Sequence, residues 1–199
     1  MSAKVILRAE RFILFHDFSY IRVEIINDMR LFIAINFSEE IKDSLLDAIN
    51  NLKEQSLGGN FSRKENLHLT LCFIGETTKV NVIKKIMEKI ESESFELSIK
   101  NFGRFKRKEG DIFWIGVEQD PRLIALWSYL SNELIAEGFD IEARDYKPHI
   151  TLGIKVLKQK YQSIDVPDGK FTVSKVYLMK SEHINGKLTY TPIFSKMLD

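Results

Sequence analysis

The sequence predicts an α+β protein with a duplicated architecture. Three observations support this prediction: strand-like runs alternate with amphipathic helices, the two halves of the chain have a similar make-up, and a short histidine motif occurs twice. The length of 199 residues fits one domain, or two lobes that share a core. With 44% hydrophobic and 29% charged residues, the composition excludes a disordered or collagen-like chain.

The spacing of apolar residues predicts two strands and two helices in the first half of the chain. Residues 31–36 read as a buried strand, and Ser38, followed by two glutamates, begins an amphipathic helix over residues 39–53. A second strand is expected at residues 67–74 and a second helix at residues 81–91.

The second half repeats this pattern. Strands at residues 95–101 and 112–118 flank the basic stretch 104–108, and Pro121 occupies the first turn of a helix that extends to Gly138. Three further strands are expected, at residues 150–156, 171–179 and 188–194.

Residues 1–28 differ from the rest of the chain. They mix strand-like pieces without clear turn chemistry, whereas the pattern that begins at Met29 could itself start a protein. Two interpretations of this N-terminal extension are open: an appendage or misassigned start, or a real extra hairpin at a sheet edge. Residues 29–199 are expected to form a single domain.

Charge and cysteine content restrict the partners and the compartment. Because 29 Lys and Arg nearly balance 28 Asp and Glu, the formal net charge is +1 and any nucleic-acid site must depend on local basic residues. The single cysteine, Cys72, cannot form an internal disulfide, which favours a reducing compartment. No apolar run approaches the roughly 18 to 20 residues that span a bilayer. We therefore expect a monomeric cytoplasmic protein without a membrane anchor.

The most informative feature is the motif His-x-Thr-Leu, which occurs at His68 to Leu71 and again at His149 to Leu152. Side chains two apart in a strand share a face, so each histidine should project together with the threonine that follows it, Thr70 or Thr151. On this alternation the opposite, apolar face carries Leu69, Leu71 and Phe73 in the first strand and Ile150, Leu152 and Ile154 in the second. Cys72 would share the polar face with Thr70, where we interpret it as buried filler.

Two imidazoles that face one cleft suit an in-line displacement at phosphorus. One ring can accept a proton from the attacking oxygen while the other donates a proton to the leaving oxygen, because an imidazole pKa near ~6.5 allows both forms at neutral pH. The hydroxyls of Thr70 and Thr151 can donate to the non-bridging phosphoryl oxygens. This chemistry requires no metal or cofactor. A zinc site is the weaker interpretation, because no Asp, Glu or Cys lies at ligand spacing beside either histidine.

Over residues 29–194 the sequence resembles the two-histidine phosphoesterase superfamily, and within it the RNA 2′,3′-cyclic phosphodiesterases, also called 2′-5′ RNA ligases. The resemblance rests on both His-x-Thr-Leu motifs, the opening Met-Arg-Leu-Phe-Ile-Ala-Ile, and Phe102-Gly-x-Phe105 followed by Trp114-Ile-Gly-Val. It implies a bilobal fold with a pseudo-two-fold axis, in which two antiparallel sheets line a central groove and helices lie outside.

The resemblance also implies an activity and a set of roles. The activity is hydrolysis of an RNA-terminal 2′,3′-cyclic phosphate to a 2′-phosphomonoester, with His149 as the proton acceptor that activates water and His68 as the proton donor to the 3′ oxygen. The same pair could run in reverse and join a 5′-hydroxyl end to form a 2′-5′ linkage. Phe105 is a candidate for base contact, and Arg144 is a candidate for binding phosphate or the adjacent nucleotide.

Several alternatives remain open at this stage. The stretch 104–108 could be a solvated basic loop, and Arg144 could form a surface salt bridge with Glu142 or Asp145. The protein could be a non-catalytic module that binds nucleotides or RNA ends. It could also act on a small nucleotide such as ADP-ribose 1″,2″-cyclic phosphate, because the motifs read only the phosphate.

Overall fold

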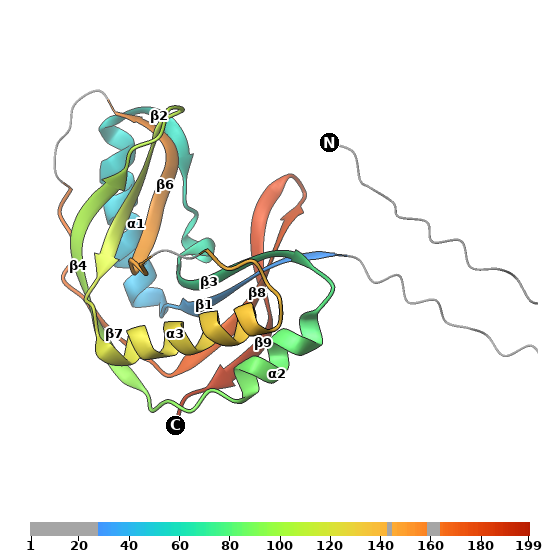
Figure 1. Cartoon of the computed structure of the whole chain (residues 1–199). Helices are drawn as coiled ribbons and strands as arrows, with labels where there is room; N and C mark the ends of the chain where they lie inside the picture. Colours follow the sequence, from blue (N-terminus) through green and yellow to red (C-terminus); the bar gives the residue numbers. More distant parts are fainter. Residues whose placement is uncertain (1–27, 143–144, 159–163) are drawn as a thin grey trace, which may run out of the picture.

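Three helices and nine strands make up the described part of the chain. The structure is a computed structural model and describes residues 28–142, 145–158 and 164–199, so the N-terminal extension lies outside it (Figure 1). The strands are β1 (Met29–Asn36), β2 (Ser56–Phe61), β3 (His68–Thr77), β4 (Phe95–Phe105), β5 (Asp111–Val117), β6 (His149–Lys158), β7 (Lys170–Val173), β8 (Lys175–Ile184) and β9 (Lys187–Met197). The α-helices are α1 (Glu39–Glu54), α2 (Val80–Glu88) and α3 (Pro121–Ala136), and a 3-10 turn, η1 (Lys64–Asn66), precedes β3.

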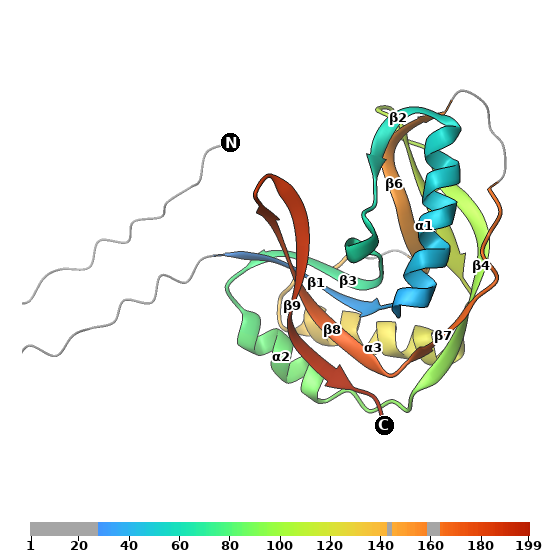
Figure 2. The same cartoon turned by 180° about the vertical axis from the view of Figure 1, so that it is seen from behind.

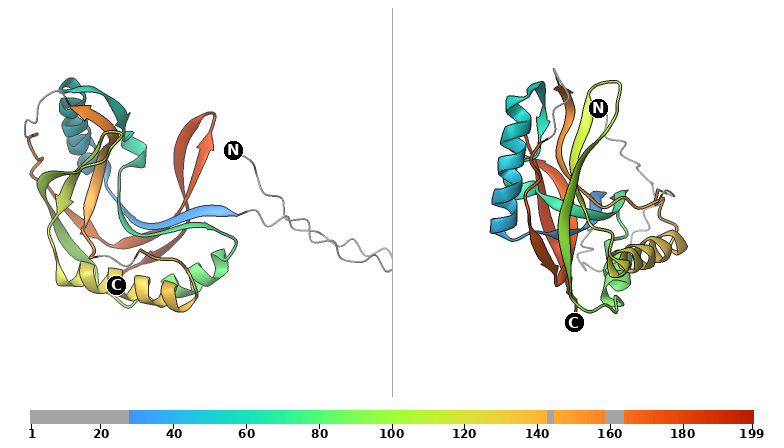
Figure 3. Two further views of the ribbon diagram at one scale, coloured as in Figure 1. Left: turned by 45° about the horizontal axis from the view of Figure 1, so that its top comes forward. Right: turned by 90° about the vertical axis from the view of Figure 1, so that its left-hand side faces the viewer.

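The strands form two antiparallel sheets, which confirms the predicted α+β class. One sheet has the order β3-β1-β8-β9 and the other has the order β2-β6-β5-β4-β7. Figures 1 and 3 show β6 and the β8–β9 hairpin rising on opposite sides of β1 and β3. The two histidine motifs therefore begin strands of different sheets, β3 and β6.

Neither sheet corresponds to one contiguous half of the chain. Strand β2 comes from the first half but pairs with β6, and the C-terminal strands β8 and β9 complete the sheet that β1 begins. The helices are exchanged in the same way: α1 follows β1 but packs on β2 and β6, whereas α3 follows β5 but packs on β3 (Figure 2). One continuous hydrophobic core results, with fully buried members such as Leu45, Ile83, Phe113 and Leu130.

One predicted strand was wrong, and one observed strand was not predicted. The run 171–179, expected as one strand, is divided at Ser174 between β7 and β8, which belong to different sheets. Strand β2 was not predicted, because Ser56–Phe61 contains two glycines and no apolar alternation; pairing with β6 stabilises it.

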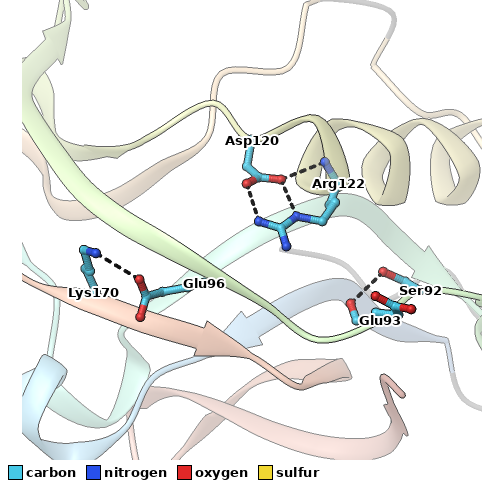
Figure 4. Close-up of polar contacts among 6 residues, drawn as sticks. All are labelled: Ser92, Glu93, Glu96, Asp120, Arg122 and Lys170. Atoms are coloured by element: carbon cyan, nitrogen blue, oxygen red, sulfur yellow. Dashed lines mark hydrogen bonds and ion pairs between the residues drawn. The ribbon is translucent and has the colours of Figure 1, made fainter.

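Polar contacts fix the end of α3 and the short strand β7. The Asp120 carboxylate accepts a hydrogen bond from the backbone N–H of Arg122, which caps the N-terminus of the helix that Pro121 begins (Figure 4). The same carboxylate forms an ion pair with the guanidinium of Arg122. The Nζ of Lys170 lies 3.0 Å from a carboxylate oxygen of Glu96 on the neighbouring strand β4.

No helix in the described part of the chain has the length and apolar content of a membrane span.

Both motif strands contain a β-bulge at the same motif position. Along β3 the pairing with β1 passes from Thr70 to Cys72 and skips Leu71; along β6 the pairing with β5 passes from Thr151 to Gly153 and skips Leu152. The extra residue reverses the alternation beyond it. The expected faces therefore hold only up to the bulge.

The bulges correct three expectations about side-chain direction. Cys72 turns into the core, where it is 2% exposed and its Sγ lies 3.4 Å from the Oγ of Ser131. Phe73 and Ile154, expected on the apolar faces, are instead 51% and 42% exposed. These two residues occupy equivalent positions, five after the histidine of each motif.

Candidate active site

A groove of about 1070 Å³ lies between the two motif strands. His68, Thr70, Thr151 and Phe32 are among the residues that line it. The lining also includes residues of the segment that leads from β2 to β3 and of the β8–β9 hairpin. A second hollow of about 330 Å³ is lined by Lys147, Pro148 and Trp114 among others; His149 belongs to the lining of neither cavity, although Pro148 before it lines the second and Thr151 after it lines the groove.

The two imidazole rings are held by the same local hydrogen bond. The Nδ1 of His68 lies 2.6 Å from the carbonyl oxygen of Asn66, and the Nδ1 of His149 lies 2.7 Å from the carbonyl oxygen of Lys147. A carbonyl can only accept, so Nδ1 carries the proton in both rings. The remaining nitrogen, Nε2, is therefore the one that exchanges a proton. In His68 it lies 3.0 Å from the Oγ1 of Thr70.

The pKa of His68 depends on its burial and on His149. Burial lowers the pKa of His68 below its usual value; the charge of His149 lowers this pKa further, and the hydrogen bond to the Asn66 carbonyl opposes both effects. A charge effect of this kind requires proximity, and Cα atoms of β3 and β6 come within 8 Å of each other. The structure thus places Thr70 and Thr151 with His68 along one groove, and it places β6, which begins at His149, beside β3. That both imidazoles serve one site stays a prediction.

Each ring is packed by aromatic side chains from its own sheet. His68 meets Phe32 at 4.8 Å and the edge of Tyr190 at 5.2 Å between ring centroids. His149 meets Phe105 edge-on at 5.2 Å and Trp114 at 6.1 Å. Such contacts restrict rotation of the imidazoles and exclude water from one side of each ring.

The predicted residue Phe105 is therefore adjacent to His149, at the end of β4. Arg104 beside it forms an ion pair with Asp111 at 2.7 Å, and the Nζ of Lys147 lies 5.6 Å from the Phe105 ring centroid and 4.8 Å from that of Trp114. The other predicted residue, Arg144, lies outside the described residues. Its role stays a prediction.

Two hydrogen bonds that the sequence did not indicate connect the motifs. The hydroxyl of Tyr146 donates to the carbonyl oxygen of Thr70 at 2.9 Å, and the hydroxyl of Ser62 donates to the carbonyl oxygen of Thr151 at 2.6 Å. Each donor lies a few residues before one motif and binds the other motif. We call this pair the cross-brace. The ring of Tyr146 also stacks on Trp127, with 5.2 Å between centroids and 8° between planes.

Comparison with known proteins agrees with this geometry. Residues 41–185 match the model of the 2′-5′ RNA ligase superfamily, and the chain is 36% identical over 177 residues to the RNA 2′,3′-cyclic phosphodiesterase of Thermotoga maritima, covering 85% of this chain and 93% of that protein. The chain belongs to the 2′-5′ RNA ligase superfamily. A second superfamily relative, the RNA 2′,3′-cyclic phosphodiesterase of Escherichia coli, is 28% identical and is covered over 93% of its length.

A solved structure of a superfamily member supports the fold. The crystal structure of Escherichia coli LigT complexed with 3′-AMP superposes with a TM-score of 0.76 at 26% identity, covering 86% of this chain and 98% of that one. Since nearly all of LigT is matched, the superfamily fold accounts for the two sheets and the groove between them.

Proposed function

We propose that this superfamily member hydrolyses the 2′,3′-cyclic phosphate at the end of an RNA chain to a 2′-phosphomonoester. The observation that carries the proposal is the matched pair of imidazoles, each with Nδ1 tied to a backbone carbonyl and each accompanied by a threonine hydroxyl. The names of the relatives, RNA 2′,3′-cyclic phosphodiesterase, support the same reaction.

The proposed reaction divides the two proton transfers between the two motifs. His149 takes a proton from water as the water oxygen attacks phosphorus, and His68 gives a proton to the 3′ oxygen as the bond between phosphorus and that oxygen breaks. Thr70 and Thr151 donate to the non-bridging oxygens, whose negative charge grows in the transition state. One water is consumed, and a proton exchange with solvent returns both rings to their starting forms.

The lowered pKa of His68 is compatible with its role as proton donor. In the free protein, burial and the neighbouring imidazole disfavour the protonated ring. A bound phosphate brings negative charge next to the ring and favours its protonation. His68 would thus gain its proton when substrate binds. Ligation would use the same groups: a 5′-hydroxyl end attacks phosphorus in place of water, the bond to the 3′ oxygen breaks, and a 2′-5′ linkage forms.

The same proposal places the enzyme in the cytoplasm as a monomer. Its single cysteine, Cys72, is buried in the core, which fits a reducing compartment. Sedimentation at enzyme concentrations used for assays should give the mass of one chain, 23.2 kDa.

The test is digestion of a synthetic RNA that ends in a 2′,3′-cyclic phosphate, in buffer containing EDTA. We expect a 2′-phosphate product at undiminished rate, because the proton transfers depend on side chains of the protein. Intact cyclic ends after prolonged incubation would contradict the proposal. Tight binding of the RNA end without any product would support a non-catalytic binding module, and faster turnover of ADP-ribose 1″,2″-cyclic phosphate would support a small-nucleotide enzyme.

A further inference from the structure

Phe73 presents an aromatic surface to the groove at a distance from the histidines. The bulge at Leu71 turns its side chain out of the core, and 51% of the residue is exposed. It is the sole aromatic among the exposed large apolar side chains of the described residues. Exposing a phenyl ring to water is unfavourable in free energy, and Phe73 is exposed in the lining of the groove. An exposed apolar side chain in such a place is typical of a binding site.

We propose that Phe73 is a stacking surface for a nucleobase upstream of the reacting end, so that the substrate class is an RNA oligonucleotide and not a mononucleotide. This inference rests on the proposed function. It assigns to the groove a second subsite that is separate from the two histidines and two threonines.

The spacing along β3 supports an upstream base. Phe73 lies five residues beyond His68, and a strand advances about 3.3 Å per residue, so the Cα atoms of the two residues are roughly 13 to 16 Å apart once the bulge is allowed for. A base that stacks on Phe73 is therefore displaced along β3 from the position of the cyclic phosphate, as a base one or two nucleotides upstream would be.

The size and charge of the groove also fit a chain of nucleotides. Its volume of about 1070 Å³ reaches the upper end of the roughly 300 to 1,000 Å³ typical of small-molecule pockets. The guanidinium of Arg30 lies 5.0 Å from the centroid of the Phe73 ring, where it can contact a phosphate that links a stacked base to the next nucleotide. Lys187 adds positive charge to the groove lining, whereas Lys180 forms an ion pair with Glu182 there.

The equivalent position of the second motif strand lacks an aromatic ring. Ile154 is 42% exposed and lines the same groove, but an aliphatic side chain has no π-face on which a base can stack. Of the two motif strands, only β3 therefore presents an exposed aromatic ring to the groove. This difference gives the RNA a direction: the chain leaves the histidines along the strand of the first motif.

The test compares one ratio, kcat/KM for a cyclic-ended tetranucleotide divided by kcat/KM for the corresponding nucleoside 2′,3′-cyclic phosphate. We expect the protein to favour the tetranucleotide about tenfold, the effect of one stacked base. Phe73→Leu, which keeps apolar bulk and removes the ring, should bring the ratio close to one, and Phe73→Tyr should preserve it. Leu157→Ala, at an exposed leucine outside the groove lining, is the control and should leave both rates unchanged.

The possible outcomes separate this inference from the proposed function. Turnover of both substrates with equal efficiency, or an unchanged ratio in Phe73→Leu, would overturn the stacking subsite and leave the reaction standing. Absence of turnover would contradict the reaction. In that case the binding of a tetranucleotide that ends in a 2′-phosphate still decides the inference: Phe73→Leu should weaken it about tenfold and Phe73→Tyr should not.

Discussion

The two motif strands share a local design but have different surroundings. In both, Nδ1 of the histidine donates to the carbonyl two residues earlier, and the leucine after the threonine forms a bulge. Yet β3 is an edge strand, packed by Phe32 and Tyr190, whereas β6 lies between β2 and β5 and is packed by Phe105 and Trp114. The repeated motif fixes the orientation of each imidazole. The side chains around the two imidazoles are not repeated, so His68 and His149 differ in their environment.

Removal of either motif histidine should have the largest effect on activity. We expect His68→Ala and His149→Ala each to lower kcat about 10² to 10⁴-fold, because each ring transfers one of two protons in the same transition state. The double variant should be less impaired than the product of the single losses, since the groups act together. Rates on a cyclic-ended RNA provide the measurement. Near-normal activity of either single variant would show that its ring is not part of the reaction.

The threonines should show the symmetry of the two motifs. Thr70→Val and Thr151→Val remove one hydroxyl each at nearly constant volume, and each should lower kcat by about 10² if that hydroxyl donates to a phosphoryl oxygen in the transition state. Thr70→Ser and Thr151→Ser keep the donor and serve as controls. A loss caused equally by the serine variants would indicate a packing role instead.

The cross-brace should affect both rate and stability. Tyr146→Phe keeps the stack on Trp127 but removes the donor to the Thr70 carbonyl, which should cost about 1 kcal/mol of unfolding free energy and lower kcat several-fold with little change in KM. Tyr129→Phe removes another tyrosine hydroxyl that donates to a backbone carbonyl, that of Ile86 on α2, which belongs to neither motif. This control should lose stability without loss of kcat. Equal kcat in Tyr146→Phe and the parent protein would remove the positioning role.

The pH dependence should reveal the burial of His68. Because its pKa is lowered in the free protein, the protonated donor form is lost at a lower pH than an exposed imidazole would lose it. The alkaline limb of kcat/KM should therefore lie below about pH 6.5, and that of kcat, which reports the substrate complex, should lie at higher pH. A kcat/KM profile whose alkaline limb lies well above neutrality would assign the donor role to another group.

The sequence predicted the helices and the motif strands, because these depend on local periodicity. Its repeat also singled out His68, His149, Thr70 and Thr151, whose catalytic roles stay predictions. It could not predict the exchange of helices between sheets or the division at Ser174, since the apolar pattern continues through that residue. The bulges could not be predicted either. Nothing in the apolar alternation of β3 signals that Leu71 has no pairing partner on β1, so Phe73 was assigned to the apolar face. Tyr190 and Ser62 reach the site through long-range pairing, which one sequence does not encode locally.

The most direct test is a titration of the protein with a nucleoside 2′-phosphate, the expected product end, followed by NMR of the imidazole side chains. If both rings contact one phosphate, the resonances of His68 and His149 should move together with a single dissociation constant, and the pKa of His68 should rise. A phosphate that perturbs one of the two motif histidines and leaves the other unchanged would contradict the shared site.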